Sequence, residues 1–286
     1  MKIDLHIHTS TGSDGAFSLE EIFREAKKRN INLMSVTDHD AIHHQPQAIG
    51  LAGKYGIAFI TGVELNVTWE YHGRSVSLDF LGYNYNPNNR PLKKKLDLIR
   101  ERRGIRAHKI IDNLNTEFNK ENIPAFTEKD LNEMQAGVDG TLGRPHIADY
   151  LILKGIVGNR QEAFDKYLVK CDVPKYPLRL SEASELISNA SGILALAHPN
   201  DPNGTSLVSV TTDLTEQTAI IEKYMLDYID GIECWHSRNN AATTAHYFEF
   251  CRNHDLLMTG GSDCHQKPLL LGTVDVPDFV AGQFKI

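Results

Sequence analysis

The sequence predicts an α/β protein built on parallel strands, and three observations support this class. Short apolar stretches of strand length alternate with amphipathic stretches of helix length, as in repeated β-α-β units. Most of these strands end abruptly in His, Asp or Glu, as is common where function collects at the carboxyl ends of parallel strands. Strand signals are absent across residues 91–176, so we expect an inserted α-helical subdomain there, with the α/β domain over 1–90 and 177–286.

The elements before the insertion follow from local patterns. Lys2 to Ile7 alternates apolar and polar residues, as a short strand does. Ser18 and Glu21 form a capping box that begins a helix ending near Asn30. The same reading predicts strands at 33–37 and 58–63, a helix at 45–55 and a β-hairpin over 65–83.

Local patterns also predict the elements of the insertion and of the C-terminal part. A long charged helix is expected at 91–118, followed by shorter helices at 128–134, 146–154 and 160–169. The α/β pattern then resumes, with strands expected at 192–197, 231–235 and 257–260 and helices at 181–190, 216–228 and 240–254.

Composition limits the classes of function. The 286 residues carry a formal net charge of −7, which argues against a nucleic-acid backbone or an anionic membrane as the main partner. No apolar run approaches the roughly 18 residues that span a bilayer. The four cysteines form no C-x-x-C pair and no signal peptide is evident, so we expect a cytoplasmic protein.

Metal-ligating residue types recur at the strand ends. His6 and His8 are two residues apart on a strand, which places both imidazoles on one face, and Asp14 follows in a glycine-flanked loop. Imidazole and carboxylate without thiolate suit Mn²⁺, Fe²⁺ or Zn²⁺. So many ligands exceed the needs of one ion and predict two to three divalent metal ions, bridged by a carboxylate such as Glu64. The other residues at strand ends are His39, His198, His236, Asp263 and His265.

The motifs DLHIHTSTGSDG, SVTDHD, GVE, ALAHP, GIE and GSDCH occur in one order along the chain. This order resembles the PHP (polymerase and histidinol phosphatase) superfamily of metal-dependent phosphoesterases. The resemblance implies a distorted (β/α)7 barrel with a trinuclear metal site on its C-terminal face. The stretch TLGRPHIADYLILKGIVGNRQEAFDKYL resembles the helical subdomain of one branch, which acts on nucleoside 3′,5′-bisphosphates or oligonucleotide 5′ ends, and a relative of that branch opens a sugar 1,2-cyclic phosphate.

The resemblance implies nine metal ligands, one of which departs from the family pattern. Where the family has a His three residues before a Gly, this chain has Asp79, which we keep as a ligand because a carboxylate can take the same position. His72 competes for this role, but its place in the hairpin turn favours a solvent-exposed residue. The expected ligands are His6, His8, Asp14, His39, Glu64, Asp79, His198, Asp263 and His265.

Substrate-binding and catalytic residues are also implied by the resemblance. Arg144 and Lys175 are expected to bind a substrate phosphate, Arg144 through the rigid fork of its guanidinium. Asp263, with a protonated His236 or His198, is expected to serve the catalytic step. The branch often reads AHPGR, whereas this chain reads AHPND, so the Arg that would reach a substrate phosphate is absent.

The expected function is hydrolysis of a small phosphate ester by a metal-bridging hydroxide. A cyclic phosphodiesterase acting on a sugar 1,2-cyclic phosphate and a 5′-3′ exonuclease on short oligoribonucleotides are the enzymatic alternatives. A histidinol-phosphate phosphatase fits the helical insertion less well. The non-enzymatic alternative is a metal-loaded binding module, which the full ligand set argues against.

Overall fold

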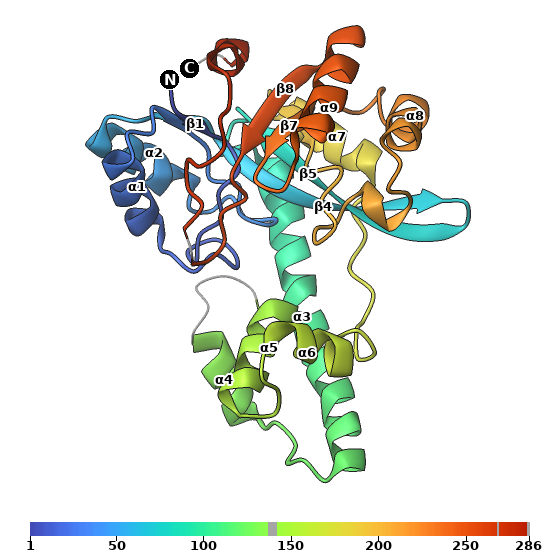
Figure 1. Ribbon diagram of the computed structural model, residues 1–286. Helices are drawn as coiled ribbons and strands as arrows, with labels where there is room; N and C mark the ends of the chain where they lie inside the picture. The colour runs from blue at the N-terminus through green and yellow to red at the C-terminus, as the bar shows by residue number, and fades with distance from the viewer. Residues whose placement is uncertain (137–141, 268, 285–286) are drawn as a thin grey trace. The chain divides into compact units, whose positions relative to one another are not determined.

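The computed structural model describes residues 1–136, 142–267 and 269–284, so Thr141 of the insertion motif lies outside the described residues. The chain divides into two compact units, Met1–Lys94 with Pro177–Ile286, and Lys95–Tyr176. All strands that the structure describes lie in the first unit, which we call the sheet unit; the second is the helical unit (Figure 1).

The sheet unit begins with a three-stranded parallel sheet in the order β1-β2-β3. Helices α1 and α2 follow its first two strands and pack against each other. The capping box of Ser18 and Glu21 is present at the start of α1, as predicted. These elements are β1 (Ile3–Asp4), α1 (Leu19–Lys28), β2 (Leu33–Met34), α2 (Gln45–Tyr55) and β3 (Ala58–Phe59).

A second, five-stranded sheet runs in the order β4-β5-β6-β7-β8. Its first pairs are antiparallel, because β4 and β5 form a hairpin and β6 runs against β5, whereas β6, β7 and β8 are parallel. Helix α7 packs on β4 and β6, and α9 packs on β7 and β8. The bounds are β4 (Gly62–Tyr71), β5 (Arg74–Tyr83), α7 (Leu180–Asn189), β6 (Ile193–Leu196), α8 (Leu214–Tyr224), β7 (Gly231–His236), α9 (Ala241–Asn253) and β8 (Leu257–Gly261).

One expected strand is divided between the two sheets. The prediction of a single strand over 58–63 is wrong, because β3 ends at Phe59 and β4 starts at Gly62 with different partners. A Cβ at Gly62 would lie 2.1 Å from Ser35 Oγ, so only glycine allows the chain to cross here. Glu64 therefore lies near the start of β4 and not at the end of a strand.

The expected closed barrel is not confirmed: the described strands form two separate sheets. Isolated parallel bridges join Ile7 to Cys264 and His39 to Glu64, so the segments after β1 and β2 lie beside the second sheet without extending it. For the same reason β1 is shorter than the predicted strand over 2–7. The segment after β1 makes its backbone hydrogen bonds to the exit of β8 instead, since Leu5 N donates to Gly260 O and Asp263 N donates to His6 O.

The helical unit has its own apolar core. Phe118 and Tyr167 are fully buried in it, and their rings meet edge to face with centroids 5.4 Å apart. The predicted helix over 160–169 is a short α-helix followed by one π-helical turn. No helix within the described ranges is long and apolar enough to cross a membrane. Helix α3 begins within the sheet unit and continues into the helical unit. The bounds are α3 (Arg90–Glu121), α4 (Glu128–Ala136), α5 (Arg144–Leu153), α6 (Arg160–Ala163) and η1 (Phe164–Leu168).

Candidate metal centre

The N-terminal segment brings its two histidines to the exit of β8. Leu5 N donates to Gly260 O at 3.1 Å, and His8 N donates to Cys264 O at 3.1 Å. These backbone bonds place His6 and His8 beside Asp263 and His265, more than 250 residues later in the chain. Sheet pairing, not sequence proximity, therefore assembles the candidate centre.

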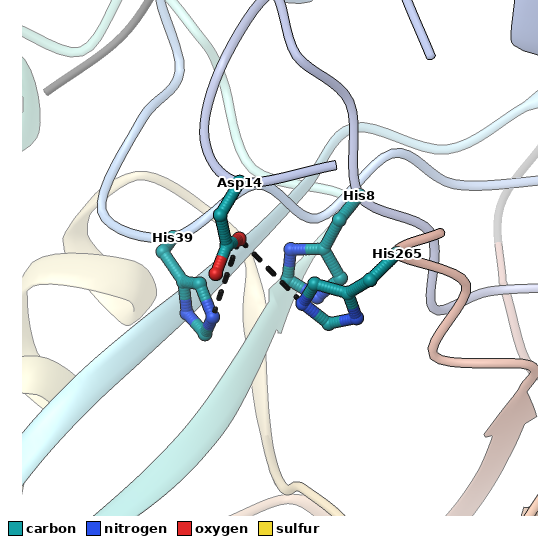
Figure 2. Close-up of side chains that lie close together, drawn as sticks. All are labelled: His8, Asp14, His39 and His265. Carbon is teal, nitrogen blue, oxygen red and sulfur yellow. Dashed lines mark ion pairs between the residues drawn. The ribbon is translucent and has the colours of Figure 1, made fainter. Parts of the chain in front are cut away.

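One group of potential ligands converges on Asp14. Its Oδ1 lies 3.9 Å from His39 Nε2 and 3.5 Å from His265 Nε2. The ring of His8 stacks on that of His265, with centroids 3.9 Å apart. Figure 2 shows the four side chains pointing toward one another from three separate segments. Their donor atoms all lie within 4.8 Å of one another, which suits a common cation.

Glu64 joins this group to a second one. Its Oε2 lies 2.9 Å from His39 Nδ1 and 3.2 Å from His8 Nε2. Its Oε1 lies 3.0 Å from His198 Nε2 and 3.5 Å from His6 Nε2. The two oxygens of one buried carboxylate thus face two different sets of imidazoles, which is the geometry that a bridging carboxylate needs.

Asp263 divides its two oxygens in a similar way. Oδ1 lies 3.4 Å from Nε2 of both His6 and His8, and 3.2 Å from His265 Nδ1. Oδ2 faces away from this group, at 3.4 Å from His236 Nε2 and 3.4 Å from Arg238 Nη1. Asp263 with His236 and Asp201 forms a further group with ligand spacing.

The imidazoles and carboxylates shift one another's pKa in opposite directions. Burial alone would lower the pKa of His8, but hydrogen bonds to Asp263 and Glu64 raise it to about 10. Burial likewise opposes the charge on His198, whose pKa Glu64 raises to about 9. Burial would raise the pKa of Glu64, but surrounding imidazoles hold it well below its usual range. Against the effect of burial, nearby imidazoles such as that of His265 likewise hold the pKa of Asp263 well below its usual range, so the carboxylates of Glu64 and Asp263 are both ionised at neutral pH, as metal ligands must be.

The unsatisfied atoms in the centre fit a bound cation. Glu64 Oε2, His39 Nδ1 and His236 Nε2 are buried, and their close contacts with charged neighbours lack the geometry of a hydrogen bond to any described residue. Buried polar atoms are rarely left without a hydrogen-bond partner unless an ion or water completes the site. The donor set is imidazole and carboxylate, and Cys264 packs in an apolar cluster with Ile7 instead of joining it. Residues present here therefore fit Mn²⁺, Fe²⁺ or Zn²⁺.

Two expected ligands have unusual backbone conformations. His198 has φ +24° and Asp263 has φ +50°, in the left-handed region that non-glycine residues rarely adopt. Each follows a strand of the second sheet by two residues. Such conformations cost about 1–3 kcal/mol each and cluster at functional sites, where they aim a side chain that a regular backbone would not.

The remaining predicted site residues belong to none of these ligand groups, although the charge of Asp79 helps to raise the pKa of His198. Asp79 is buried on β5 and accepts a hydrogen bond from Asn66 Nδ2, outside the ligand groups described above. Arg144 Nη1 donates to Asp172 Oδ2 at 2.7 Å within the helical unit. Lys175 is half-buried in the segment after η1. Roles for these three in binding metal or substrate stay predictions. His72 is exposed at the hairpin turn, as expected.

Two buried carboxylates that support the centre were not singled out by sequence reasoning. Glu233 Oε1 pairs with His6 Nδ1 at 3.0 Å, and its Oε2 accepts from the His198 backbone N–H at 2.8 Å. The signal in the sequence is a charged residue inside the apolar strand GIECW.

Asp38 is the second of these buried carboxylates, and it supports the loop that carries Asp14. It accepts hydrogen bonds from Thr9 N and Ser13 Oγ at 2.7 and 2.6 Å, and it pairs with His44 Nε2 at 3.0 Å. A Cβ at Gly12 would lie 2.2 Å from Asp38 Oδ2, so the loop can close on this carboxylate only with glycine there. The Gly-rich loop is therefore fixed in place by a buried anion.

Comparison with protein families gives a direct match. The PHP domain model matches residues 4–170, more than half of the chain. The chain belongs to the PHP domain family. Among curated relatives, a 3′,5′-nucleoside bisphosphate phosphatase of Chromobacterium violaceum is 30% identical over 285 residues, covering 92% of this chain and 87% of the relative. A 5′-3′ exoribonuclease of Haemophilus influenzae is 32% identical over 205 residues, covering 69% of each.

Solved structures agree with this membership. A protein from Bifidobacterium adolescentis described as a metal-dependent phosphoesterase superposes with a TM-score of 0.81 at 27% identity, covering 98% of this chain and 94% of that one. The mixed α/β arrangement is thus that of PHP phosphoesterases.

Proposed function

We propose that this hydrolase of phosphoester bonds removes a phosphate from a small bisphosphorylated nucleoside. The observation that carries the proposal is the convergence of imidazoles and carboxylates around Glu64, whose two oxygens each face two imidazoles. The bisphosphate class is supported by the 30% identity over 92% of the chain to a relative named for that substrate.

The ligand groups around Asp14, Glu64 and Asp263 would hold two to three divalent ions. Such ions, when bound, supply Lewis acidity to the phosphoryl oxygens and lower the pKa of an attacking water. Our proposal keeps Asp79 as a further ligand and Arg144 and Lys175 as phosphate-binding groups.

Residues of this chain orient the candidate ligands and can donate a proton. Glu233 accepts from His6 Nδ1 and directs Nε2 toward Glu64 and Asp263, so Nε2 is the nitrogen that would be offered to a metal ion. His236 Nε2 lies 3.4 Å from Asp263 Oδ2, and the proposal keeps this imidazole as the group that gives a proton to the departing alkoxide.

Phosphate release by manganese-reconstituted protein tests this function. Adenosine 3′,5′-bisphosphate is compared with a five-carbon sugar 1,2-cyclic phosphate and a 5′-phosphorylated oligoribonucleotide, each with and without chelator. We expect chelator-sensitive release that is fastest from the bisphosphate and is lost in Asp263→Asn. Arg252→Gln, an exposed change on α9, is the matched control. Preferred cleavage of the oligoribonucleotide would favour the activity of the Haemophilus influenzae relative, and release from none would refute the proposal.

A further inference from the structure

Arg238 lies where the second sheet meets the candidate metal centre. It follows β7 by two residues and precedes α9. Its Nη1 donates to Asp201 Oδ2 and lies 3.4 Å from Asp263 Oδ2. Asp201 is fully buried, whereas 41% of the Arg238 side chain is exposed. The guanidinium is therefore anchored on one side by a buried anion and open to solvent on the other.

The contacts of Arg238 bear on whether the group of Asp201, His236 and Asp263 holds a metal ion. Its spacing suits a metal ion, but Nη1 of Arg238 already contacts both carboxylates. An arginine keeps its positive charge at any pH at which proteins are folded. The guanidinium thus provides the positive charge that a metal ion would otherwise bring to these two carboxylates.

The connection that carries Arg238 is held in one conformation. The Arg238 backbone N–H donates to His236 Nδ1 at 3.3 Å, and Asn239 Nδ2 donates to Cys234 O at 3.0 Å. Asn240 then caps α9 by accepting from Thr243 N at 2.9 Å. An arginine on so constrained a turn loses little conformational entropy when it binds a ligand.

We propose that Arg238 binds a substrate phosphate next to the one that is hydrolysed, and that it thereby selects bisphosphorylated substrates. Asp263 supplies the geometric reason, because Oδ1 faces the imidazoles of the centre and Oδ2 faces Arg238. Only the Asp263 carboxylate separates the guanidinium of Arg238 from the imidazoles of the candidate centre. A second phosphate on the same small molecule would therefore reach the exposed part of this guanidinium. Guanidinium and phosphate match as a bidentate pair. The inference rests on the proposed function and names the group that sets its substrate class.

The test separates the second phosphate from the reacting one. Steady-state hydrolysis of adenosine 3′,5′-bisphosphate and of adenosine 3′-monophosphate is measured for wild type, Arg238→Gln and Arg238→Lys. Loss of a charge-assisted bidentate contact predicts a KM for the bisphosphate raised about 10- to 100-fold in Arg238→Gln. We expect kcat and the monophosphate kinetics to change less than about threefold, and Arg238→Lys, which keeps the charge without the fork, to recover part of the loss.

A binding measurement keeps the test independent of turnover and folding. In chelator, the thermal stabilisation of wild type by the bisphosphate is expected to exceed that by the monophosphate, and Arg238→Gln is expected to lose this difference. Because that variant leaves Asp201 buried without its cation, Arg238→Gln with Asp201→Asn provides a neutral version of the same site. Arg252→Gln is the control, and metal content by mass spectrometry is expected to be equal in all variants.

The outcomes distinguish the two proposals. Equal losses of kcat on both nucleotides would place Arg238 on the reacting phosphoryl group and overturn the inference. Unchanged bisphosphate kinetics and unchanged thermal stabilisation would also overturn it. Failure of wild type to hydrolyse either nucleotide would refute the proposed function alone, because the binding difference in chelator still decides the role of Arg238.

Discussion

Replacing Glu233 by glutamine should weaken metal binding without removing a candidate ligand. The carboxylate is fully buried, and it accepts from His6 Nδ1 at 3.0 Å and from His198 N at 2.8 Å. Glutamine has the same shape but offers one acceptor and one NH₂ donor. If the NH₂ faces His6, Nδ1 must accept and Nε2 carries the proton, which blocks ligation. If the NH₂ faces the His198 backbone N–H, two donors meet and that hydrogen bond cannot form.

The expected size of the effect follows from these two hydrogen bonds. A hydrogen bond to a charged group contributes about 1.5–3 kcal/mol, and glutamine can keep only one of the two. Substitutions behind a metal-ligating histidine usually cost about 10- to 100-fold in metal affinity. A factor of 10 to 100 is about 1.4–2.7 kcal/mol, so the two figures agree.

Competition with a fluorescent chelator measures Mn²⁺ affinity in wild type, Glu233→Gln and Asp230→Asn. Asp230 is the matched control, because its carboxylate accepts from Leu194 N at 2.8 Å at the start of the same strand without contacting a candidate ligand. We expect a loss of about 10- to 100-fold in Glu233→Gln and none in the control. Wild-type affinity in a folded Glu233→Gln protein would refute the role we assign to this carboxylate.

Three further predictions concern metal, pH and the helical unit. Mn²⁺ at 100 times its Kd should stabilise the protein by about 2.7 kcal/mol in thermal unfolding, and chelator should reverse this; an unchanged Tm would count against a metal centre. Because a ligating imidazole must be neutral and the pKa of His8 is raised to about 10, protons compete with the metal, so Mn²⁺ affinity should rise between about pH 6 and about pH 9 in the chelator competition assay. A flat profile would contradict that competition. Phe118→Ala should destabilise the helical unit by about 3–5 kcal/mol in urea unfolding, whereas Asn119→Gln, an exposed change on the same helix, should be nearly neutral. Equal stability of the two variants would show that the Phe118 contacts are not needed.

Local signals in the sequence were sufficient for most of the elements. The capping box of Ser18 and Glu21 lies where the sequence places it, and α2 has the predicted bounds of 45–55. The strand-end pattern also anticipated the residues that converge, because His6, Asp14 and Asp263 all join ligand groups. Capping, periodicity and motif order are properties of neighbouring residues, so they can be read without the fold.

Only the tertiary structure determined which side-chain atoms lie close enough to form a common site. The position of Glu64 between two sets of imidazoles depends on the chain crossing between sheets at Gly62, which no local pattern announces. Arg238 contacts Asp201 of the motif AHPND although the two residues are 37 positions apart in the sequence. Ligand sharing and the pairing of buried charges depend on sheet register and on bonds between distant segments. A sequence lists the residues capable of such contacts, but only the packed strands bring them within bonding distance.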